Sequence, residues 1–507
     1  MVLNAQQRQI GRDNFGDASS EVFRITRRQM LSAGLVIPTA AAMYWGYGKL
    51  KGAPVKTALI GTGDQGCYAH ISQSNPEYVD FVAFSDIRPS SQQRARDAFK
   101  ALYGPEKANK IRLEEDYHKL FDDPDIELVI IALPLHLHAP ATIAALQKGK
   151  HVLCEKLMAK TVTECKQMVN AAAANNRFLA IGHQRHYSYM YANALSLIKQ
   201  GVVGDIRHIH AYWHRNQTGF DSWSKEIPPE DRKVDIAKYG YESYEQLVRW
   251  RIDNRTGGGL MVELGSHQLD AASIFLNHKL PTEMVGTGVT SYFKDGRTIA
   301  DHIFMQYLFG DQNVFKSLPD RAKEPTTASA PAEPVLLPLP YTTDNTVVTY
   351  SSISTNAFDG YGEQVNGSRA TLIMDREMEA YLFYEDFKDK SKDTRVDTRI
   401  AWAENRIGKP VMSSGGTAAW GSAVGTADTL TSRGYREEQE HLAWLIREIG
   451  KPDPSRPEMK PRCDGLVALA DAVVALCSNI AMEKKKRIVM NPKWFDPSDP
   501  ANPESEV

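Results

Sequence analysis

The sequence predicts an α/β protein in which a doubly wound parallel sheet is followed by a second α/β domain with a mostly antiparallel sheet. Three observations support this prediction. Short apolar runs alternate with helical patterns between residues 55 and 183, as in parallel sheets covered by helices. Beyond residue 184, β-rich runs bounded by turns follow one another with few helices between them. The 507 residues, 42% hydrophobic and 24% charged, exclude a disordered chain and a multi-span membrane protein.

Charge and cysteine content exclude further classes of protein. Lys and Arg number 60 and Asp and Glu number 62, which gives a net charge of −2. A general nucleic-acid binder needs a basic surface that displaces counterions, so this balance argues against nucleic-acid binding. The five cysteines are odd in number and lack the spacing of zinc ligands. We therefore expect neither a disulfide-built scaffold nor a metal site.

Residues 1–54 differ from the rest of the chain and are expected to be an export signal and linker. Arg27 and Arg28 precede a mostly apolar stretch from Met30 to Tyr44, which is the layout of a twin-arginine signal. The stretch is shorter than the ~20 apolar residues that span a bilayer comfortably. We expect the protein to use the twin-arginine export machinery and to be periplasmic, or membrane-anchored facing the periplasm. The alternative is a chance arginine pair before a buried helix.

A glycine-rich motif, GTGDQG at residues 61–66, directly follows the first predicted strand, residues 55–60. In such a motif the first glycine permits a tight turn, the second lets the backbone approach a pyrophosphate, and the third lets helix and strand pack closely. The following helix N-terminus offers free N–H groups to the phosphates. The motif predicts a dinucleotide site whose residues include Gly61, Gly63, Gln65 and Gly66.

An acidic residue ends the second predicted strand, residues 81–86, about 20 residues after the last glycine of the motif. A carboxylate at this place, Asp86, would hold the ribose hydroxyls of the adenosine and repel a 2′-phosphate, which favours NAD. Arg88 keeps NADP open as the alternative. A glycine-rich turn in an unrelated α/β domain is the competing interpretation.

Polar residues follow the later strands of the predicted parallel sheet, whose apolar runs are residues 128–133, 149–154 and 178–182. Ligands of doubly wound sheets bind beyond the carboxyl ends of the strands. The residues expected there are Pro134, His138 and Glu155 on the cofactor side, and Lys156 and Arg185 toward the substrate.

The second half is predicted to contain β-rich runs at residues 206–216, 283–293, 302–309, 346–354 and 370–374, and helices near 436–449 and 464–482. Alternation places His208, His210 and His214 on one strand face, which is more typical of a wet subunit interface than of a metal site. The residues that allow a sugar-stacking, a subunit-contact or a core role are Trp213, Arg215 and Trp250.

The chemically densest segment is GGGLMVELGSHQLD, residues 257–270. If it opens a helix, Glu263 and His267 lie at i and i+4 on one face, and Asp270 follows three residues later. A carboxylate beside an imidazole fixes its tautomer and raises its basicity, so His267 is a candidate general base. A surface Glu–His pair without a catalytic task is the alternative.

The motifs GTGDQG, GKHVLCEK at residues 149–156 and GGGLMVELGSHQLD, in this order, resemble the glucose–fructose oxidoreductase/inositol dehydrogenase/MocA (Gfo/Idh/MocA) family over residues 55–482. The resemblance implies a Rossmann domain at 55–183, a substrate and oligomerisation domain with a large, open sheet at 184–482, and a C-terminal tail at 483–507. It also implies NAD or NADP as cofactor, a sugar or cyclic polyol as substrate, and a dimer or tetramer assembled through the open sheet.

Position by position, the resemblance implies roles for several residues. Lys156 matches the family lysine near the nicotinamide and substrate hydroxyl, and His267 matches the candidate general base. Glu263 replaces the aspartate that assists this histidine. Leu157 replaces a proline whose cis peptide aims the lysine, and a non-proline cis bond costs about 3 kcal/mol, so we expect altered geometry there. The remaining matches are His138, which follows the fourth strand, and Asp270, the acid of the HxxD ending.

The resemblance implies hydride transfer between NAD(P) and a sugar or polyol hydroxyl, with His267 or Lys156 taking the hydroxyl proton. Two alternatives stay open. One is an NAD-dependent glycoside hydrolase that oxidises its sugar transiently, and the other is a non-catalytic, cofactor-bound sugar-binding or scaffold protein. Because an exported protein has no obvious supply of NAD, we expect a tightly bound cofactor.

Overall fold

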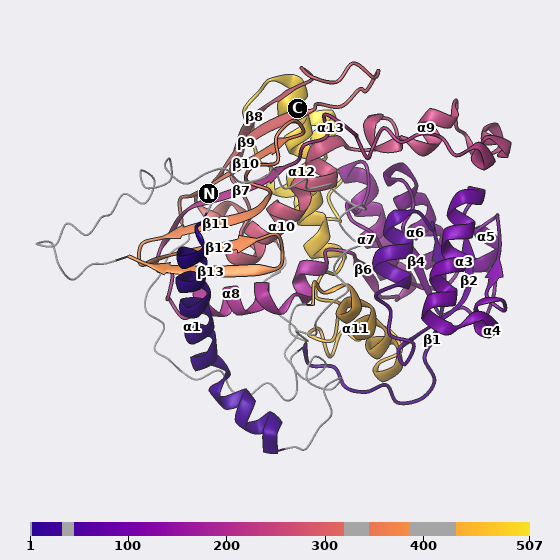
Figure 1. Ribbon diagram of the computed structural model, residues 1–507, viewed down its shortest axis with the longest axis horizontal. Helices are drawn as coiled ribbons and strands as arrows, with labels where there is room; N and C mark the ends of the chain where they lie inside the picture. The colour runs from indigo at the N-terminus through magenta and orange to yellow at the C-terminus, as the bar shows by residue number, and fades with distance from the viewer. Residues whose placement is uncertain (1–2, 33–44, 319–343, 386–431) are drawn as a thin grey trace, which may run out of the picture.

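The computed structural model describes residues 3–32, 45–318, 344–385 and 432–507, which form two sheets with their helices (Figure 1). The first sheet has six parallel strands in the order β3-β2-β1-β4-β5-β6. Every residue of β4 and β5 is buried, as expected for strands covered on both faces. The strands are β1 (Val55–Ile60), β2 (Val79–Ser85), β3 (Arg112–Leu113), β4 (Leu128–Ile131), β5 (His151–Cys154) and β6 (Leu179–Ile181). The predicted doubly wound parallel sheet is confirmed.

Helices separate these strands along the chain, which is what allows neighbouring strands to run parallel. The longest one that lies between strands, α3, starts after Arg88 with a proline in its first turn and ends at Gly104. A capping box of Thr161 and Glu164 starts α7. The helices are α3 (Pro89–Tyr103), α4 (Pro105–Ala108), α5 (His118–Phe121), α6 (His138–Gln147) and α7 (Val162–Asn175).

The second sheet has eight strands in the order β13-β12-β11-β7-β10-β9-β8-β14, and only the β7–β10 pair is parallel. The mostly antiparallel sheet is therefore confirmed. Helices α10 (Ser266–Phe275) and α12 (Gly465–Lys484) pack against β7 and β8 on one face. The strands are β7 (Ile206–His214), β8 (Glu283–Val289), β9 (His302–Phe309), β10 (Thr346–Ile353), β11 (Tyr361–Gly367), β12 (Ala370–Asp375), β13 (Glu379–Tyr384) and β14 (Ile488–Val489).

The chain returns to the first sheet near its C-terminal end. Helix α11 (Tyr435–Glu448) packs on β1 and β2, and its Leu442 and Leu445 share a core cluster with them. Trp45 and Tyr47, which precede the first strand, are buried in the same cluster. The core around the parallel sheet thus includes segments from both sides of residues 55–183.

Residues 483–507, expected as a tail, belong to the fold. Strand β14 pairs with β8, and Trp494 and Phe495 are buried in the main core. The Lys166 ammonium of α7 donates to three backbone carbonyls of residues 493–501. The packing of this segment into the fold was not predicted, because a two-residue strand has too few residues to show a periodic pattern in the sequence.

The N-terminal helix α1 (Ala5–Ser32) packs on β13 of the large sheet (Figure 1). Arg8 and Arg12 form ion pairs with Glu379, and the backbone at Gly11 lies so close that a Cβ would collide with Tyr381 and Phe383. Arg27 and Arg28 fall within this helix. Most of the predicted apolar signal segment lies in residues 33–44, outside the described residues.

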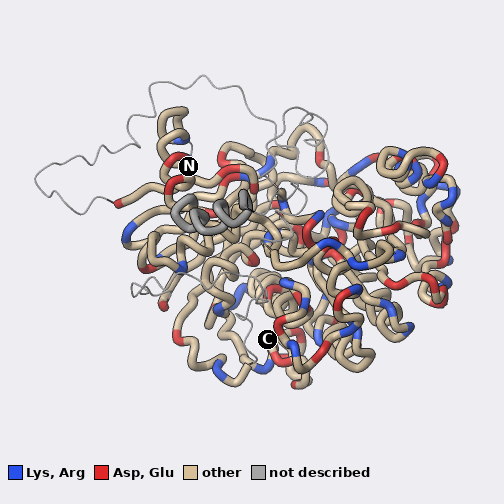
Figure 2. The backbone as a smooth tube through the Cα atoms, turned by 90° about the horizontal axis from the view of Figure 1, so that it is seen from below, with Lys and Arg blue, Asp and Glu red and all other residues tan. Residues whose placement is uncertain are grey.

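Composition has two visible consequences in the structure. All five cysteines are unpaired and buried, so the expectation of no disulfide scaffold is confirmed. Figure 2 shows Lys and Arg interspersed with Asp and Glu along the chain, as the near-zero net charge predicts.

Among the described residues one helix, α12, has the length and hydropathy of a membrane span. Of its most apolar stretch, 78% is buried inside the protein.

Candidate active site

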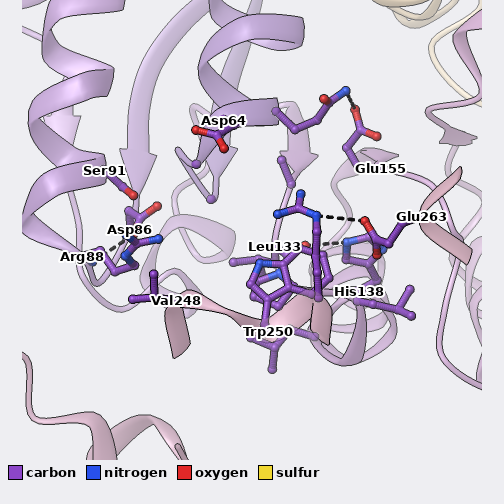
Figure 3. Close-up of a pocket in the computed structure, with 18 of the residues that line it drawn as sticks. Asp64, Asp86, Arg88, Ser91, Leu133, His138, Glu155, Val248, Trp250 and Glu263 are labelled. Atoms are coloured by element: carbon purple, nitrogen blue, oxygen red, sulfur yellow. Dashed lines mark hydrogen bonds and ion pairs between the residues drawn. The ribbon is translucent and has the colours of Figure 1, made fainter. Parts of the chain in front are cut away.

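One cavity of about 1010 Å³ lies at the carboxyl ends of the parallel strands and extends to β7 and the start of α10 (Figure 3). In Figure 3, Asp86, Arg88 and Ser91 lie at one end, and Glu155 and Glu263 at the other. Most of the predicted site residues line it, but Gly66, Arg185 and Asp270 do not. Those that line it are Gly61, Gly63, Gln65, Asp86, Arg88, Pro134, His138, Glu155, Lys156, Glu263 and His267.

Each of the three glycines of GTGDQG excludes a side chain for a different structural reason. Gly61 has a φ of +89°, and a Cβ there would lie 2.5 Å from the Ala132 carbonyl oxygen. A Cβ on Gly66 would collide with the Gly61 carbonyl. Gly63 has no protein atom within 4 Å of its Cβ position and lines the cavity, so a side chain there would occupy ligand space. This backbone fits the pyrophosphate of a dinucleotide.

Asp86 lies directly after β2 and is fixed by local hydrogen bonds. Its Oδ2 accepts from the Thr62 N–H at 2.8 Å, and its Oδ1 accepts from the Arg88 N–H at 2.9 Å. Burial raises the pKa of Asp86, although both backbone hydrogen bonds oppose the shift. Arg88 is the residue that made NADP the alternative cofactor in the sequence analysis. Its guanidinium donates to buried Asp231 at 2.8 Å. Asp231 is 143 residues away in sequence, and no local pattern indicated it.

Glu155 joins the glycine loop to the end of β5. It accepts hydrogen bonds from Gln65 at 2.9 Å and from the Lys156 N–H at 3.2 Å, and its Oε1 lies 2.9 Å from His70 Nε2. Burial alone would raise the pKa of Glu155, but the hydrogen bond and charge of His70 keep it below the usual value. His70 lies in the π-helical segment η1 (Gly66–Ile71) and was not predicted. Glu155 thus positions the loop that would hold the phosphates.

His138 ties two strand ends together. Its ring nitrogens lie 2.8 Å from the carbonyl oxygens of Leu157 and Leu133. Burial opposes protonation, but the neighbouring Cys154 and these two acceptors raise the pKa of His138 to about 9. As an imidazolium it donates to both carbonyls and fixes the backbone on either side of the cavity.

Lys156 crosses from the parallel sheet to the second domain. Its ammonium donates to the carbonyl of Glu263 at 2.7 Å and to that of Val262 at 3.4 Å. Burial lowers the pKa of Lys156, while the charges of Glu263 and Glu155 oppose the shift. The Lys156–Leu157 peptide is cis. The expectation that Leu157 would change this geometry is therefore wrong.

Glu263 does not pair with His267 as the spacing predicted. Residues Met261–Gly265 form a π-helical turn, η7, before α10 begins, and this turn departs from the α-helical i,i+4 geometry. The Glu263 carboxylate instead accepts from Arg251 Nε at 3.0 Å. Arg251 was missed because nothing local connects it to residue 263.

His267 is half-buried and lines the cavity. Within the described part of the chain its Nδ1 has no hydrogen-bond partner, and its ring lies 5.6 Å from that of Trp213. Burial lowers the pKa of His267 well below its usual value, and the cations Lys156 and Arg185 act in the same direction. The ring is therefore neutral at physiological pH, as a general base must be.

Arg185 was expected to contact substrate, but it lies behind the cavity wall. Its guanidinium is 1% exposed and donates to Glu363 and Glu377 at 2.7 Å and to the His267 carbonyl at 2.6 Å. Arg185 is thus a positioning residue that holds the backbone of His267. A strand-end position predicted proximity to the site and could not show which side of the wall the side chain occupies.

Asp270 was also expected to contact substrate and does not. It accepts from His186 at 2.7 Å and lies 3.6 Å from His183 Nδ1. The ligand atoms of His183, Asp270 and Asp471 lie within 4.8 Å of one another in a buried cluster that no sequence spacing indicated. Asp270 lies about one turn after His267 on α10, so its carboxylate faces the segment after β6 and not the cavity.

The second domain supplies cavity residues whose roles the sequence left open. Trp213 stacks on Tyr361 with ring centroids 4.4 Å apart, and Arg251 lies over Trp250 at 4.2 Å. Trp213, Arg215 and Trp250 all line the cavity, which favours a ligand-contact role over a core role. The row of His208, His210 and His214 lies elsewhere, and none of these histidines lines the cavity.

Comparison with known proteins relates this site to oxidoreductases. Residues 55–183 match the family model described as the Gfo/Idh/MocA oxidoreductase family, NAD-binding Rossmann fold. An uncharacterized oxidoreductase of Schizosaccharomyces pombe is 27% identical over 226 residues, which is 44% of this chain and 52% of the relative. Inositol 2-dehydrogenase of Salmonella paratyphi B is 32% identical over 141 residues, 28% of this chain and 40% of the relative. The chain spans about half, or less, of the length of these relatives.

Solved structures extend the likeness to both sheets. Levoglucosan dehydrogenase, solved with NADH and levoglucosan, has a TM-score of 0.55 and 17% identity over 86% of this chain and 98% of its own. Aldose-aldose oxidoreductase from Caulobacter crescentus, complexed with glycerol, has a TM-score of 0.54 and 16% identity over 86% of this chain and 100% of its own. At these identities the likeness concerns the fold. Residues 55–183 are thus similar to the NAD-binding Rossmann domain of Gfo/Idh/MocA oxidoreductases, and the chain shares the fold of these solved enzymes.

Proposed function

We propose that this protein is an NAD(P)-dependent dehydrogenase that moves a hydride between the nicotinamide and a hydroxyl-bearing carbon of a sugar or cyclic polyol. The observation that carries the proposal is a single cavity with the glycine loop and Asp86 at one end and Lys156 and His267 at the other. A dinucleotide held by the loop would place its reactive ring near the two proton-handling side chains.

Each side chain would have a distinct task. The backbone of residues 61–66 would hold the pyrophosphate, and Asp86 the adenosine ribose. The bound nicotinamide supplies hydride transfer. Neutral His267 would accept the hydroxyl proton at a ring nitrogen, and Lys156 would donate a hydrogen bond to the substrate oxygen as its negative charge develops.

The test uses the full chain with a panel of sugars and cyclic polyols and NAD, following NADH absorbance. We expect His267→Asn to reduce kcat/KM by about 10²–10⁴, the usual contribution of general acid–base catalysis, without weakening NAD binding. Full turnover by this variant on a substrate of the wild-type enzyme would contradict the proposed role. Absence of NAD binding by the wild-type chain would contradict the proposed function.

A redox-neutral glycosidase is the second candidate. Glycosyl hydrolase family 109 proteins of Shewanella baltica are 31% identical over 155 residues, 30% of this chain and 34% of theirs. Release of p-nitrophenol from p-nitrophenyl glycosides without net NADH would favour this candidate. Net NADH formation from free sugars would favour the dehydrogenase.

We also propose that the protein is exported through the twin-arginine route with a tightly bound NAD. The support is the arginine pair Arg27 and Arg28 ahead of the apolar stretch. Replacement of both arginines by lysine is expected to leave the protein in the cytoplasmic fraction. Mass spectrometry of nucleotide released on denaturation tests the second part, and stoichiometric NAD is the expected result.

A further inference from the structure

Arg215 is a buried cation in the cavity wall. Its backbone N–H donates to the Ile353 carbonyl at 2.7 Å, which continues the β7–β10 ladder past the end of β7. Its side chain lines the cavity, and the residue is 2% exposed. Its buried Nε has no hydrogen-bond partner, and among the described residues no acceptor is hydrogen-bonded to the rest of its guanidinium.

The other arginines of the cavity differ from Arg215 in forming ion pairs, although the Nε of Arg376 also has no hydrogen-bond partner within the described residues. Each has a carboxylate oxygen within ion-pair distance, and the distances run from 2.5 to 3.9 Å. Within the described ranges Arg215 has no such ion pair. The pairs are Arg88 with Asp231, Arg94 with Asp64, Arg251 with Glu263, Arg376 with Asp375, and Arg433 with Glu377.

The acid whose charge acts on Arg215 is already engaged. Asp221 raises the pKa of Arg215, but its carboxylate forms an ion pair with Arg297 at 2.5 Å. Burial is the larger effect and lowers the pKa of Arg215 to about 10, so the guanidinium still carries its charge at neutral pH. A buried charge of this kind is unfavourable unless a partner compensates it.

The guanidinium is held in place for a ligand. Its Cζ lies 4.3 Å from the centroid of the Trp223 ring, a cation–π contact that occupies one face and leaves the N–H donors available. Trp213 precedes it by two residues, so the two side chains point to the same side of the extended strand. The Trp213 ring is 5.6 Å from that of His267, which places Arg215 in the wall that adjoins the base.

We infer that Arg215 binds a carboxylate of the substrate, so that the sugar or polyol oxidised here is a sugar acid. The inference rests on the proposed dehydrogenase function and names its substrate class. A carboxylate offers two oxygens to the planar fork of a guanidinium and matches its single charge. A phosphate group carries up to two charges, so a single guanidinium would leave part of its charge uncompensated.

The experiment measures binding to the NADH-loaded full-length protein by calorimetry. The probes are pairs that share a carbon skeleton, D-glucose with D-glucuronate and D-galactose with D-galacturonate, and D-glucose 6-phosphate as a phosphate probe. In the wild type we expect at least one sugar acid to bind with an affinity at least about 10-fold higher than its neutral sugar. This is the size of effect that a hydrogen-bonded charge pair contributes.

Arg215→Met is expected to abolish this preference while leaving the affinity for the neutral sugar within about 2-fold. The matched control is Arg207→Met on the same strand, where the arginine is exposed and pairs with Asp205, and the acid preference should remain. Arg215→Lys, which keeps the charge without the fork, should retain part of the preference and serves if the methionine variant does not fold.

The outcomes distinguish the sugar-acid inference from the proposed dehydrogenase function on which it rests. Absence of NADH binding, titrated first, overturns the proposed function. NADH binding without preference for any acid overturns only the sugar-acid assignment, and an Arg215-dependent preference for glucose 6-phosphate replaces carboxylate by phosphate. A lower Tm of ligand-free Arg215→Met with an unchanged acid preference would assign Arg215 to the fold. We expect its Tm to be equal to or above that of the wild type, because an uncompensated charge is removed.

Discussion

Lys156 and His267 come from different domains and meet in one cavity, and their environments separate their tasks. Half-buried Lys156 is held by two backbone carbonyls at the start of η7, whereas His267 is neutral and unbonded at Nδ1 within the described residues. A donor held in place is suited to stabilise charge on oxygen, and a neutral imidazole to accept a proton. The assignment of base and stabiliser follows from these surroundings.

Lys156→Met should therefore remove the stabilising donor while keeping the aliphatic stem. We expect kcat to fall by about 10²–10³ and the NAD dissociation constant to change less than about 3-fold. Steady-state kinetics and a nucleotide titration check both. Lys148→Met, at an exposed lysine paired with Asp122, is the control and should behave as wild type. Equal losses in NAD affinity and turnover would instead indicate a role for Lys156 in cofactor binding.

Cofactor choice also depends on single residues. Asp86 would repel a 2′-phosphate, and Asp231 and Ser90 hold the nearby Arg88 by hydrogen bonds. We expect Asp86→Ser to lower the ratio of NAD affinity to NADP affinity by about 10-fold or more, because the charge that repels the 2′-phosphate is lost. Adding Asp231→Asn should improve NADP binding further, because it frees Arg88 for the phosphate. Titration with both cofactors measures this, and an unchanged ratio would rule out Asp86 as the selector.

The sequence predicted which side chains gather at the strand ends better than it predicted their contacts. Gly61, Gly63, Gln65, Asp86 and Lys156 line the cavity because parallel strands bring their carboxyl ends together, and His267 reaches the same cavity from α10. Spacing along a helix placed Glu263 beside His267, but a π turn and Arg251 redirected it. Tertiary partners of this kind leave no trace in local periodicity.

At the scale of elements, the long apolar strands were predictable and the polar ones were not. β11 reads YGEQVNG, with two glycines and a glutamate, which are residues depleted in strands. It forms because β7 and β12 pair with it on both sides and bury Glu363 against Arg185. β13 follows β12 after a tight turn, and its buried side chains pack under α1. Such strands are determined by their neighbours rather than by their own composition.

Helix α11 depends on a histidine that must stay neutral. His441 is buried, its Nδ1 lies 2.7 Å from the Tyr187 hydroxyl, and its ring stacks on Tyr47. Burial, with a smaller effect of Arg462, lowers the pKa of His441 to about 3. An unfolded histidine titrates near pH 6.5. Between these values only the unfolded chain binds the proton, so stability from this site is complete above pH 6.5 and declines as pH falls toward 3.

His441→Gln keeps a hydrogen-bonding group but cannot titrate. We expect the free energy of unfolding of the wild type, minus that of the variant, to be constant above about pH 7.5 and to decrease below pH 6.5, by at most about 1.4 kcal/mol per pH unit. Urea unfolding at pH 8.5, 7.5, 5.5 and 4.5 measures the difference. A difference independent of pH would mean that the buried ring takes up a proton in the folded state.

At the scale of the whole molecule, the large sheet has one face covered by helices and an opposite face that α1 covers at β13 and that is open along β8 and β9. Helices α10 and α12 pack on one face, and side chains on the other alternate outward along β8 and β9. Val285, Val289 and Phe304 are 43%, 40% and 46% exposed there, and cross-strand pairing makes Phe304 the neighbour of Thr287 and Ser351. Exposed apolar side chains gathered on a sheet face are typical of protein–protein contact sites.

We propose that two or four copies assemble through this open face. Phe304→Glu would place a charge in the centre of the contact, where leaving it buried and unpaired is unfavourable, while in a free monomer the same side chain would be half exposed. We expect light scattering after size exclusion to give a dimer or tetramer for the wild type and a monomer for the variant. Phe358→Glu, at a phenylalanine 61% exposed between β10 and β11, is the control and should keep the wild-type mass. A wild-type monomer, or an assembly that Phe304→Glu leaves intact, would show that the open face is not the contact.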